Sequence, residues 1–247
     1  MIPKVIHYCW FGGNPLTELA EKCIKSWKKF CPDYEIIRWD ESNFDISQNK
    51  YCAEAYESKK WAFVSDYARL KILYEYGGIY MDTDVEVLKN LDAFLNHPAF
   101  SGFENESQIP TGIMASEKFG KWVNCLLSYY DNRSFILPDG NFDLTTNVIS
   151  ITDTTMKHYP LTLNNTFQNI DGIFTLYPKD FFCPKNNVTG KLEITENTHA
   201  IHHFNGSWTT SANRRNTIIY QRLTRYLGKN TAERVKKFKK KVWSLFK

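Results

Sequence analysis

Residues 2–39 read IPKVIHYCWFGGNPLTELAEKCIKSWKKFCPDYEIIRW, and this stretch decides the fold class. Its apolar and aromatic start predicts a buried strand that stops at a Gly-Gly turn. Thr17 can then cap a helix that runs to about Phe30, and residues 34–39 predict a second strand. A strand, a helix and a second strand in this order indicate an α/β protein with a parallel sheet.

Further along the chain, a second helix and a third strand lead to a pair of carboxylates. Residues 61–76 contain no helix breaker, a Gly-Gly pair can end the helix, and residues 79–82 predict a buried strand. In extended backbone Asp82 and Asp84 face the same side. Their charges repel unless a cation lies between them, and Mg²⁺ or Mn²⁺ prefers such oxygen ligands. The C-terminal end of a parallel strand is also where open α/β sheets bind ligands.

By itself, Asp82-Thr83-Asp84 is only a weak indication of a metal site, because the same tripeptide is also typical of a solvated turn or of a pair of helix caps. Support comes from the preceding helix, where Asp66 and Arg69 lie three residues apart on one face. If that face lines the cleft, Arg69 can pair with a phosphate while Asp66 accepts a hydrogen bond from a sugar hydroxyl. The pair could instead form an exposed salt bridge, or Arg69 could merely orient Asp66.

Several motifs occur together in a recognisable order, namely residues 6–13, 65–69, 76–84 and 201–208. With them the chain resembles the Asp-x-Asp sugar transferases of glycosyltransferase family thirty-two and, more distantly, the clostridial glucosylating toxins. The resemblance spans about residues 1–210. It implies an A-type nucleotide-sugar fold, which is a Rossmann-like, mixed but mainly parallel sheet flanked by helices. It also implies a divalent cation, Mn²⁺ or Mg²⁺, and retention of anomeric configuration.

The resemblance assigns roles to the residues of the middle block and to one tryptophan near the N-terminus. It suggests that Trp10 stacks on the donor base, although a core position for this side chain is equally consistent with the sequence. Asp66 and Arg69 would bind the transferred sugar and its neighbouring groups. Asp82 would lie near the ribose and the metal, and Asp84 would be the direct metal ligand.

Further site residues are expected, one inside that block and three outside it. Tyr80 and Asn147 are expected to bind substrate, the latter at the sugar. Ser207 and Trp208 are expected to reach the diphosphate, although Trp208 could instead only pack its loop. Front-face attack on the sugar is the mechanism that the resemblance implies, because the sequence offers no assured nucleophile.

The histidine pair at residues 202 and 203 offers a third metal ligand. Successive side chains of a strand point to opposite faces, so only one of the two easily joins Asp84. We expect this ligand to be His203, because His203 and Gly206 resemble the His-x-x-Gly with which related A-type transferases complete their metal site.

The charge distribution argues against nucleic acid as a partner. The net charge is +4, but residues 229–247 carry eight Lys/Arg against one Glu, so residues 1–228 are slightly acidic. A nucleic-acid-binding body would be basic. The sequence therefore predicts a catalytic domain over residues 1–228 and a separate basic segment over residues 229–247.

Cysteine usage and hydropathy bear on the cellular compartment. Six cysteines are scattered without a C-x-x-C pair, which argues against a zinc site and a disulfide framework. The chain opens directly into strand-like sequence and contains no apolar run long enough to span a bilayer. We expect reduced thiols and a cytoplasmic protein.

The basic segment has the pattern of an amphipathic helix. Lysines lie mostly opposite an apolar stripe formed by Val235, Phe238, Val242, Leu245 and Phe246. Such a helix can lie in the plane of an anionic membrane, which would place the protein peripherally on the inner face of the plasma membrane. The alternative is a helix docked on the body with its basic face in solvent.

Together these inferences predict a retaining, metal-dependent glycosyltransferase of surface polysaccharide synthesis. It would move a hexose from a nucleotide-sugar, in first place a UDP-sugar and next a mannose donor, to an oligosaccharide or lipid-linked glycan acceptor. Two alternatives remain open at this point. A glycoside hydrolase also uses paired carboxylates but needs no metal, and a non-catalytic binding or scaffold protein could retain a decayed site.

Overall fold

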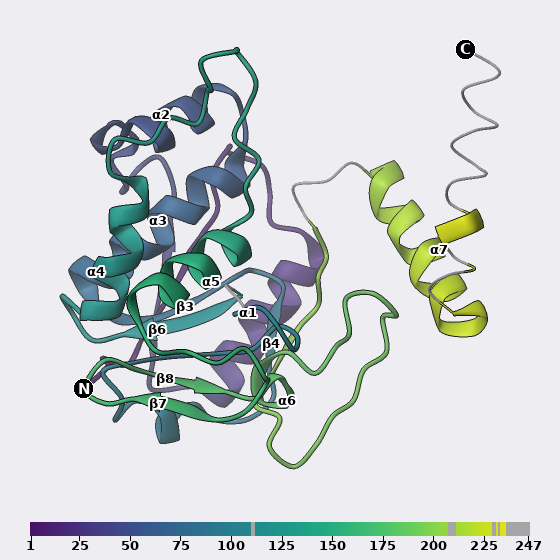
Figure 1. The fold of residues 1–247 in the computed structure, drawn as a ribbon. Coiled ribbons are helices and arrows are strands. Elements are labelled where there is room, and N and C mark those ends of the chain that lie inside the picture. Colours follow the sequence, from purple (N-terminus) through teal and green to yellow (C-terminus); the bar gives the residue numbers. More distant parts are fainter. Residues whose placement is uncertain (110–111, 207–210, 229–230, 232, 236–247) are drawn as a thin grey trace.

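A computed structural model of the chain describes residues 1–109, 112–206, 211–228, 231 and 233–235. In Figure 1 a twisted sheet lies between helices, and a C-terminal helix lies beside this body. The main sheet holds β1 (Val5–Cys9), β2 (Glu35–Trp39), β3 (Gly78–Met81), β5 (Ala99–Gly102), β6 (Ile113–Ser116), β7 (Gln168–Ile170) and β8 (Phe174–Tyr177). The helices are α1 (Glu18–Phe30), α2 (Lys50–Glu57), α3 (Trp61–Tyr76), α4 (Lys121–Leu127), α5 (Asn147–His158), α6 (Lys179–Phe182) and α7 (Ser211–Leu227).

The strand order is β2-β1-β3-β6-β5-β8-β7. β1 pairs in parallel with both β2 and β3, and β5 pairs in parallel with β8, whereas β6 and β7 run antiparallel to their neighbours. The predicted mixed but mainly parallel sheet is therefore confirmed. β1, β3 and β5 point the same way, so their C-terminal ends meet at one edge, where the site lies.

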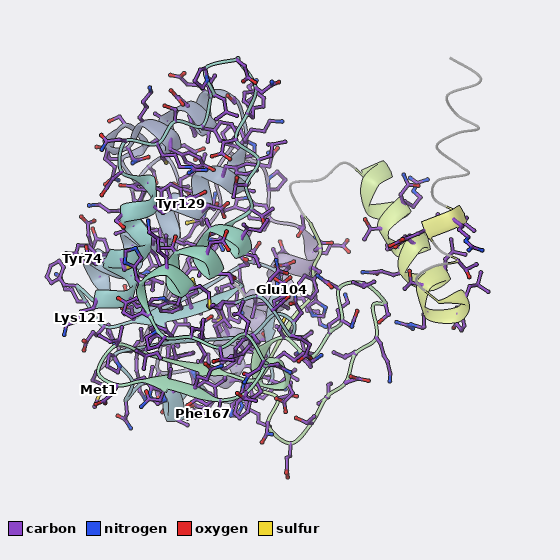
Figure 2. All side chains as sticks on the ribbon, in the orientation of Figure 1. Met1, Tyr74, Glu104, Lys121, Tyr129 and Phe167 are labelled. Carbon is purple, nitrogen blue, oxygen red and sulfur yellow. The ribbon has the colours of Figure 1, made fainter. Side chains whose placement is uncertain are left out.

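Side-chain alternation along the strands builds a separate apolar core on each face of the sheet. Ile6 and Tyr8 of β1 pack with α1 and α6, whereas Cys9 packs with α2 to α5 on the opposite face. β3 alternates in the same way, with Ile79 on the α1 side and Tyr80 on the α3 side. Side chains fill the space between the ribbons of both layers (Figure 2). Both faces of the sheet are thus covered, as the apolar strands require.

The connection from α3 into β3 brings a helix face next to the sheet edge. α3 ends at Gly77, whose φ of 69° a side-chain-bearing residue rarely adopts. Gly78 lies so close to β1 that an added Cβ would meet the Val5 carbonyl oxygen at 2.7 Å. This tight approach holds the α3 residues and the end of β3 together.

The Asp-x-Asp motif occupies the turn between two strands rather than a continuing strand. β3 ends at Met81, the amide of Val85 donates to the Asp82 carbonyl oxygen at 3.0 Å, and the chain then enters β4 (Val85–Val87). β4 pairs antiparallel with β9 (Ala200–His202) in a small second sheet, with Val85 opposite His202. This pairing brings residues 84 and 202 together, although they lie far apart in the sequence.

The described part of the C-terminal region ends with one helix and a few further residues. The helix α7 (Ser211–Leu227) falls inside the segment predicted as the catalytic domain. The predicted amphipathic helix over residues 229–247 lies outside the described residues, apart from residues 231 and 233–235. Among the helices that the structure describes, none is long and apolar enough to cross a membrane. No disulfide joins the six cysteines, all of which lie among the described residues.

Candidate donor and metal site

A cavity of about 670 Å³ opens at the C-terminal ends of β1 and β3. Its walls come from the end of β1, from α3, from the β3–β4 turn, from the start of α5 and from the segment after β9. The structure thus brings most of the predicted site residues to one cavity, which is lined by Trp10, Asp66, Arg69, Tyr80, Asp82, Asp84 and Asn147, and also by His202.

Arg69 is the centre of a buried charge network on one wall. Its Nη2 donates to Asp66 Oδ1 at 3.0 Å, its Nη1 lies 3.2 Å from Asp82 Oδ1, and its Nε donates to the Ser65 carbonyl oxygen at 3.1 Å. The Arg69 side chain is only 6% exposed. The pair is therefore not an exposed salt bridge, because Arg69 holds a carboxylate from α3 and one from the β3–β4 turn at the same time.

Tyr80 contacts two members of this network. The Arg69 guanidinium lies over the Tyr80 ring, 4.7 Å from its centroid, and the Tyr80 hydroxyl donates to Asp82 Oδ1 at 3.1 Å. Burial raises the pKa of Tyr80 well above its usual value, so the hydroxyl keeps its proton and acts as a donor. Tyr80 was predicted to bind substrate. Although it lines the cavity, its side chain is almost fully buried and its hydroxyl is already engaged.

Asn147 is the first residue of α5, and its Nδ2 donates to Asp66 Oδ1 at 3.1 Å. Asp66 is thereby fixed by groups from two helices. Burial raises the pKa of Asp66 to about 6, while the Arg69 charge and the Asn147 hydrogen bond act in the opposite direction. A buried carboxylate at the cavity wall, oriented by two donors, is well suited to accept a hydrogen bond from a hydroxyl.

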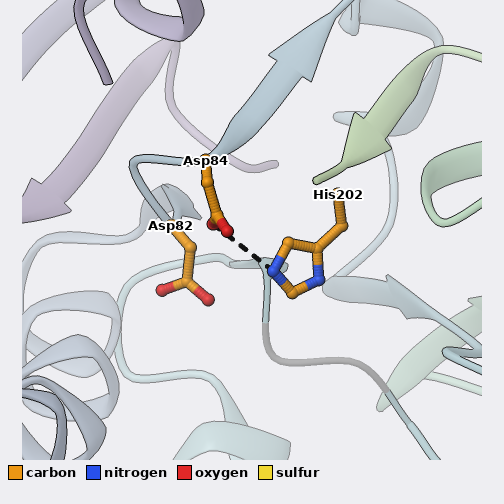
Figure 3. Close-up of side chains that lie close together, drawn as sticks. All are labelled: Asp82, Asp84 and His202. Carbon is orange, nitrogen blue, oxygen red and sulfur yellow. Dashed lines mark ion pairs between the residues drawn. The ribbon is translucent and has the colours of Figure 1, made fainter. Parts of the chain in front are cut away.

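Asp84 lies in a second cluster, together with Asp82 and His202 (Figure 3). His202 Nε2 lies 3.4 Å from Asp84 Oδ1, and the amide of Asn205 donates to Asp84 Oδ2 at 2.7 Å. Burial would raise the pKa of Asp84, but the His202 charge and the hydrogen bonds lower it to about 2. Burial likewise opposes the charge on His202, yet Asp84 holds the pKa of His202 well above its usual value. Asp84 is therefore ionised at neutral pH.

The choice of His203 as the third metal ligand is corrected by the structure. His203 Nε2 lies 2.8 Å from Glu86 Oε2, and Lys22 binds the same carboxylate oxygen at 2.9 Å. His203 thus points to the α1 side of β4, away from Asp84. Which of the two histidines faces Asp84 depends on the β4–β9 register, with Val85 opposite His202, and the sequence does not reveal this register.

The residues at the turn fit a divalent cation. Ligand atoms of Asp82, Asp84 and His202 all lie within 4.8 Å of one another. Two carboxylates and one neutral imidazole are a donor set that suits Mn²⁺, so His202 would give up its proton when the cation binds, and water or substrate oxygens would complete the coordination. His202 Nε2 faces Asp84, so it is the ring nitrogen that could bind the cation (Figure 3). The cation would lie between the Arg69 network and the segment that follows β9.

Three predicted site residues remain, and the structure describes only one of them, Trp10. Trp10 lines the cavity, packs partly buried against the core on the α1 side, and donates from its Nε1 to the Asn14 carbonyl oxygen at 2.6 Å. Ser207 and Trp208 lie outside the described residues.

Glu104 is a cavity residue that the sequence analysis did not identify. It follows β5, and it lines the same cavity as Asp82 and His202. Burial raises the pKa of Glu104, and Asn187 Nδ2 lies 3.3 Å from its Oε1. Its position after a strand that runs parallel to β3 was the available signal, because such strands end at the same edge of the sheet.

The fold resembles that of a solved glycosyltransferase. Among solved structures, the chain resembles "PaToxG Glycosyltransferase" with a TM-score of 0.52 and 20% identity, over 64% of this chain and 70% of that chain. The predicted A-type glycosyltransferase fold is thus confirmed.

Sequence comparison points to the same class. Residues 17–101 match the family described as "Glycosyltransferase sugar-binding region containing DXD motif", and this segment includes Asp66, Arg69, Asp82 and Asp84. Inositol phosphoceramide mannosyltransferase 3 of Schizosaccharomyces pombe is 36% identical over 125 residues, which are 47% of this chain and 34% of the relative. Inositol phosphoceramide mannosyltransferase 2 of the same yeast is 26% identical over 73% of this chain and 54% of the relative. The chain thus spans between a third and about half of the length of these relatives.

Proposed function

We propose that this chain is a metal-dependent glycosyltransferase that transfers a hexose from a nucleotide-sugar. The proposal depends on one observation: two clusters of polar side chains line the same cavity. One is the Asp82, Asp84 and His202 group, and the other is the Arg69 network with Asp66. A glycosyl donor needs a partner for its diphosphate and a partner for its sugar hydroxyls, and these clusters supply both.

Each part of the nucleotide-sugar donor would have its own binding residues in the cavity. Asp84 and His202 would hold the cation with help from Asp82, and Trp10 would stack on the base at the other end of the cavity. The bound cation supplies Lewis-acid stabilisation of the departing diphosphate. Asp66 would accept a hydrogen bond from the transferred sugar, and Arg69 would stabilise negative charge that develops on the leaving group. Ser207 and Trp208 remain proposed contacts of the diphosphate.

The proposed chemistry retains the anomeric configuration. The bond from the anomeric carbon to the diphosphate oxygen breaks, and the bond to the acceptor oxygen forms on the same face. The acceptor proton passes to the departing diphosphate oxygen. Asp66 is a poor candidate for a covalent nucleophile, because Arg69 and Asn147 both engage its Oδ1 and the side chain is buried. This supports front-face attack.

Donor and acceptor are proposed from the relatives' names together with the sequence. The relatives are named as mannosyltransferases, so a mannosyl donor is favoured over the UDP-hexose that the sequence suggested. Their names also specify inositol phosphoceramide, a lipid, which agrees with the proposal of a lipid-linked acceptor. A cytoplasmic location and a role in surface polysaccharide synthesis remain predictions from the sequence.

The proposal is tested by a screen of GDP- and UDP-activated hexoses, mannose included, for release of the nucleoside diphosphate with Mn²⁺ and with a chelator. We expect hydrolysis of one donor in Mn²⁺, loss of that activity in chelator and its return when Mn²⁺ is restored. Cleavage of a glycoside with full activity in chelator would instead support the hydrolase. Failure of every nucleotide-sugar to bind or react would support the non-catalytic scaffold.

A further inference from the structure

The helix α7 carries no acidic residue but four arginines, in the sequence SANRRNTIIYQRLTRYL. It lies outside the sheet-and-helix body (Figures 1 and 2). One side of α7 contacts the loop that precedes β9. Thr224 is buried, Gln221 Nε2 donates to the Asn187 carbonyl oxygen at 2.9 Å, and Arg225 Nε donates to the Thr189 carbonyl oxygen at 3.2 Å. These contacts determine which side of α7 faces outward.

The outward side combines large apolar side chains with arginines. Its residues recur at intervals of three, four and seven, which places them on one face of a helix, namely Arg215, Ile218, Ile219, Arg222 and Tyr226. Ile218 is 49% exposed, Ile219 is 48% exposed and Tyr226 is 79% exposed. Neither Arg215 nor Arg222 forms an ion pair with the residues that the structure describes. An apolar and positively charged face of α7 is thus directed away from the described residues that this helix contacts.

We infer that this face of α7 binds an anionic membrane surface, with the helix lying in the plane of the interface. Isoleucines would enter the boundary of the acyl chains, Tyr226 would lie at the headgroups, and the long arginine side chains would extend to the lipid phosphates. Charge complementarity favours an anionic bilayer, since α7 has only positive charges and residues 229–247 add a net excess of basic residues. The inference does not depend on the proposed transferase activity.

Sedimentation of the full chain with lipid vesicles tests the inference. Vesicles contain phosphatidylcholine alone or phosphatidylcholine with phosphatidylserine. The full-length chain should sediment with the anionic vesicles and much less with the neutral ones. Ile218→Glu with Ile219→Glu should weaken binding to anionic vesicles by about tenfold or more, because it removes the inserted side chains and adds negative charge. Since residues 229–247 are present in every variant, the difference reports on α7.

Two further variants make the result specific. Arg215→Gln with Arg222→Gln should weaken binding several-fold at low salt, and the difference should shrink at about 1 M salt, where charges are screened within about 3 Å. Met156→Glu with Ile194→Glu changes two exposed apolar residues outside α7 and should bind like the unaltered chain. Circular dichroism checks that each variant keeps its helix content.

Three outcomes would overturn the inference. The first is that the full-length chain does not bind anionic vesicles. The second is that the Ile218→Glu and Ile219→Glu variant binds them as well as the unaltered chain, which would leave residues 229–247 as the membrane-binding segment. The third is that the chain forms a dimer that this variant disrupts and that anionic vesicles do not compete with, which would make the face a protein interface.

Discussion

Asp82 and Asp84 are identical carboxylates two residues apart, yet their neighbours differ, and this gives them different roles in the proposed cation site. Asp82 accepts from Tyr80 and lies beside Arg69, so a large part of its charge is already balanced by the protein. Asp84 is held by His202 and by a backbone amide, and its pKa is lowered to about 2. This asymmetry supports Asp84 as the main anchor of the cation and Asp82 as its helper.

The two neighbouring histidines offer a matched test at the same scale. His202→Ala should weaken Mn²⁺ binding by about tenfold or more, because it removes one of three clustered donors. His203→Ala should change Mn²⁺ affinity little, since His203 Nε2 lies against Glu86 on the other side of β4. Isothermal titration with Mn²⁺ measures both affinities. Equal losses in the two variants, or a larger loss in His203→Ala, would contradict the assignment.

Asp66 predicts a pH dependence of stability. Its pKa is raised from the ordinary 3.8 to about 6, so the folded state binds this proton more tightly than the unfolded state. The contribution therefore favours folding at low pH and is lost as the pH rises to about 6. Relative to Asp66→Asn, the unaltered chain should lose up to about 3 kcal/mol of unfolding free energy between pH 4 and pH 7.

Urea unfolding at several pH values measures this difference. Asp153→Asn, which removes an exposed aspartate from α5, is the control and should follow the unaltered chain across the range. Parallel curves for Asp66→Asn and the unaltered chain would show that Asp66 does not titrate in this window.

At the scale of elements, the metal site depends on the fit between the start of β6 and the end of β9. Gly112 precedes β6, and an added Cβ there would lie 2.9 Å from His202 Nδ1. Gly112→Ala should therefore displace His202 and weaken Mn²⁺ binding while the sheet still forms. Titration with Mn²⁺ and circular dichroism together check this expectation.

Gly172→Ala is the matched control for this variant. No atom lies within 4 Å of the position its Cβ would take, although its φ of 65° makes the substitution strained. It should lower the stability by about 1 kcal/mol without changing Mn²⁺ affinity. If Gly112→Ala binds Mn²⁺ as tightly as the unaltered chain, the packing between β6 and β9 does not position His202.

Local sequence patterns predicted those elements whose contacts are local. Residues 61–76 form α3 as expected, because an uninterrupted helical pattern ends at a Gly-Gly pair, and Thr17 caps α1 through its side chain. The arrangement of Asp66 and Arg69 followed from their spacing on one helix turn. The β4–β9 pairing joins residues 85–87 to residues 200–202, and no local pattern encodes such a register. The choice between His202 and His203 failed for that reason.

α7 was missed for a different physical reason. Its sequence is mostly polar, and Ile218, Ile219, Tyr226 and Leu227 are exposed instead of packed in a core, so it lacks the pattern of a helix that packs on a sheet. Glu104 was missed because its place in the cavity comes from the order of strands in the sheet. At both positions the contacts that matter are made by segments distant in the sequence.

For the whole molecule, the central claim is that the cavity at the sheet edge binds a nucleoside diphosphate through a divalent cation. The cavity combines an ionised Asp84, a nearby imidazole and a buried arginine network, while the membrane-facing helix α7 lies outside the body. Donor binding and membrane binding should therefore be separable, and variants of α7 should leave nucleotide affinity unchanged.

Isothermal titration of GDP and UDP into the full chain, with Mn²⁺ or with a chelator, is the most direct test of that claim. The account predicts that one nucleotide binds in Mn²⁺ and that chelation abolishes this binding. It also predicts that Asp84→Asn weakens binding by about tenfold or more, while Asp153→Asn has no effect. Equal binding of the nucleotide in Mn²⁺ and in chelator, or full binding by Asp84→Asn, would contradict it.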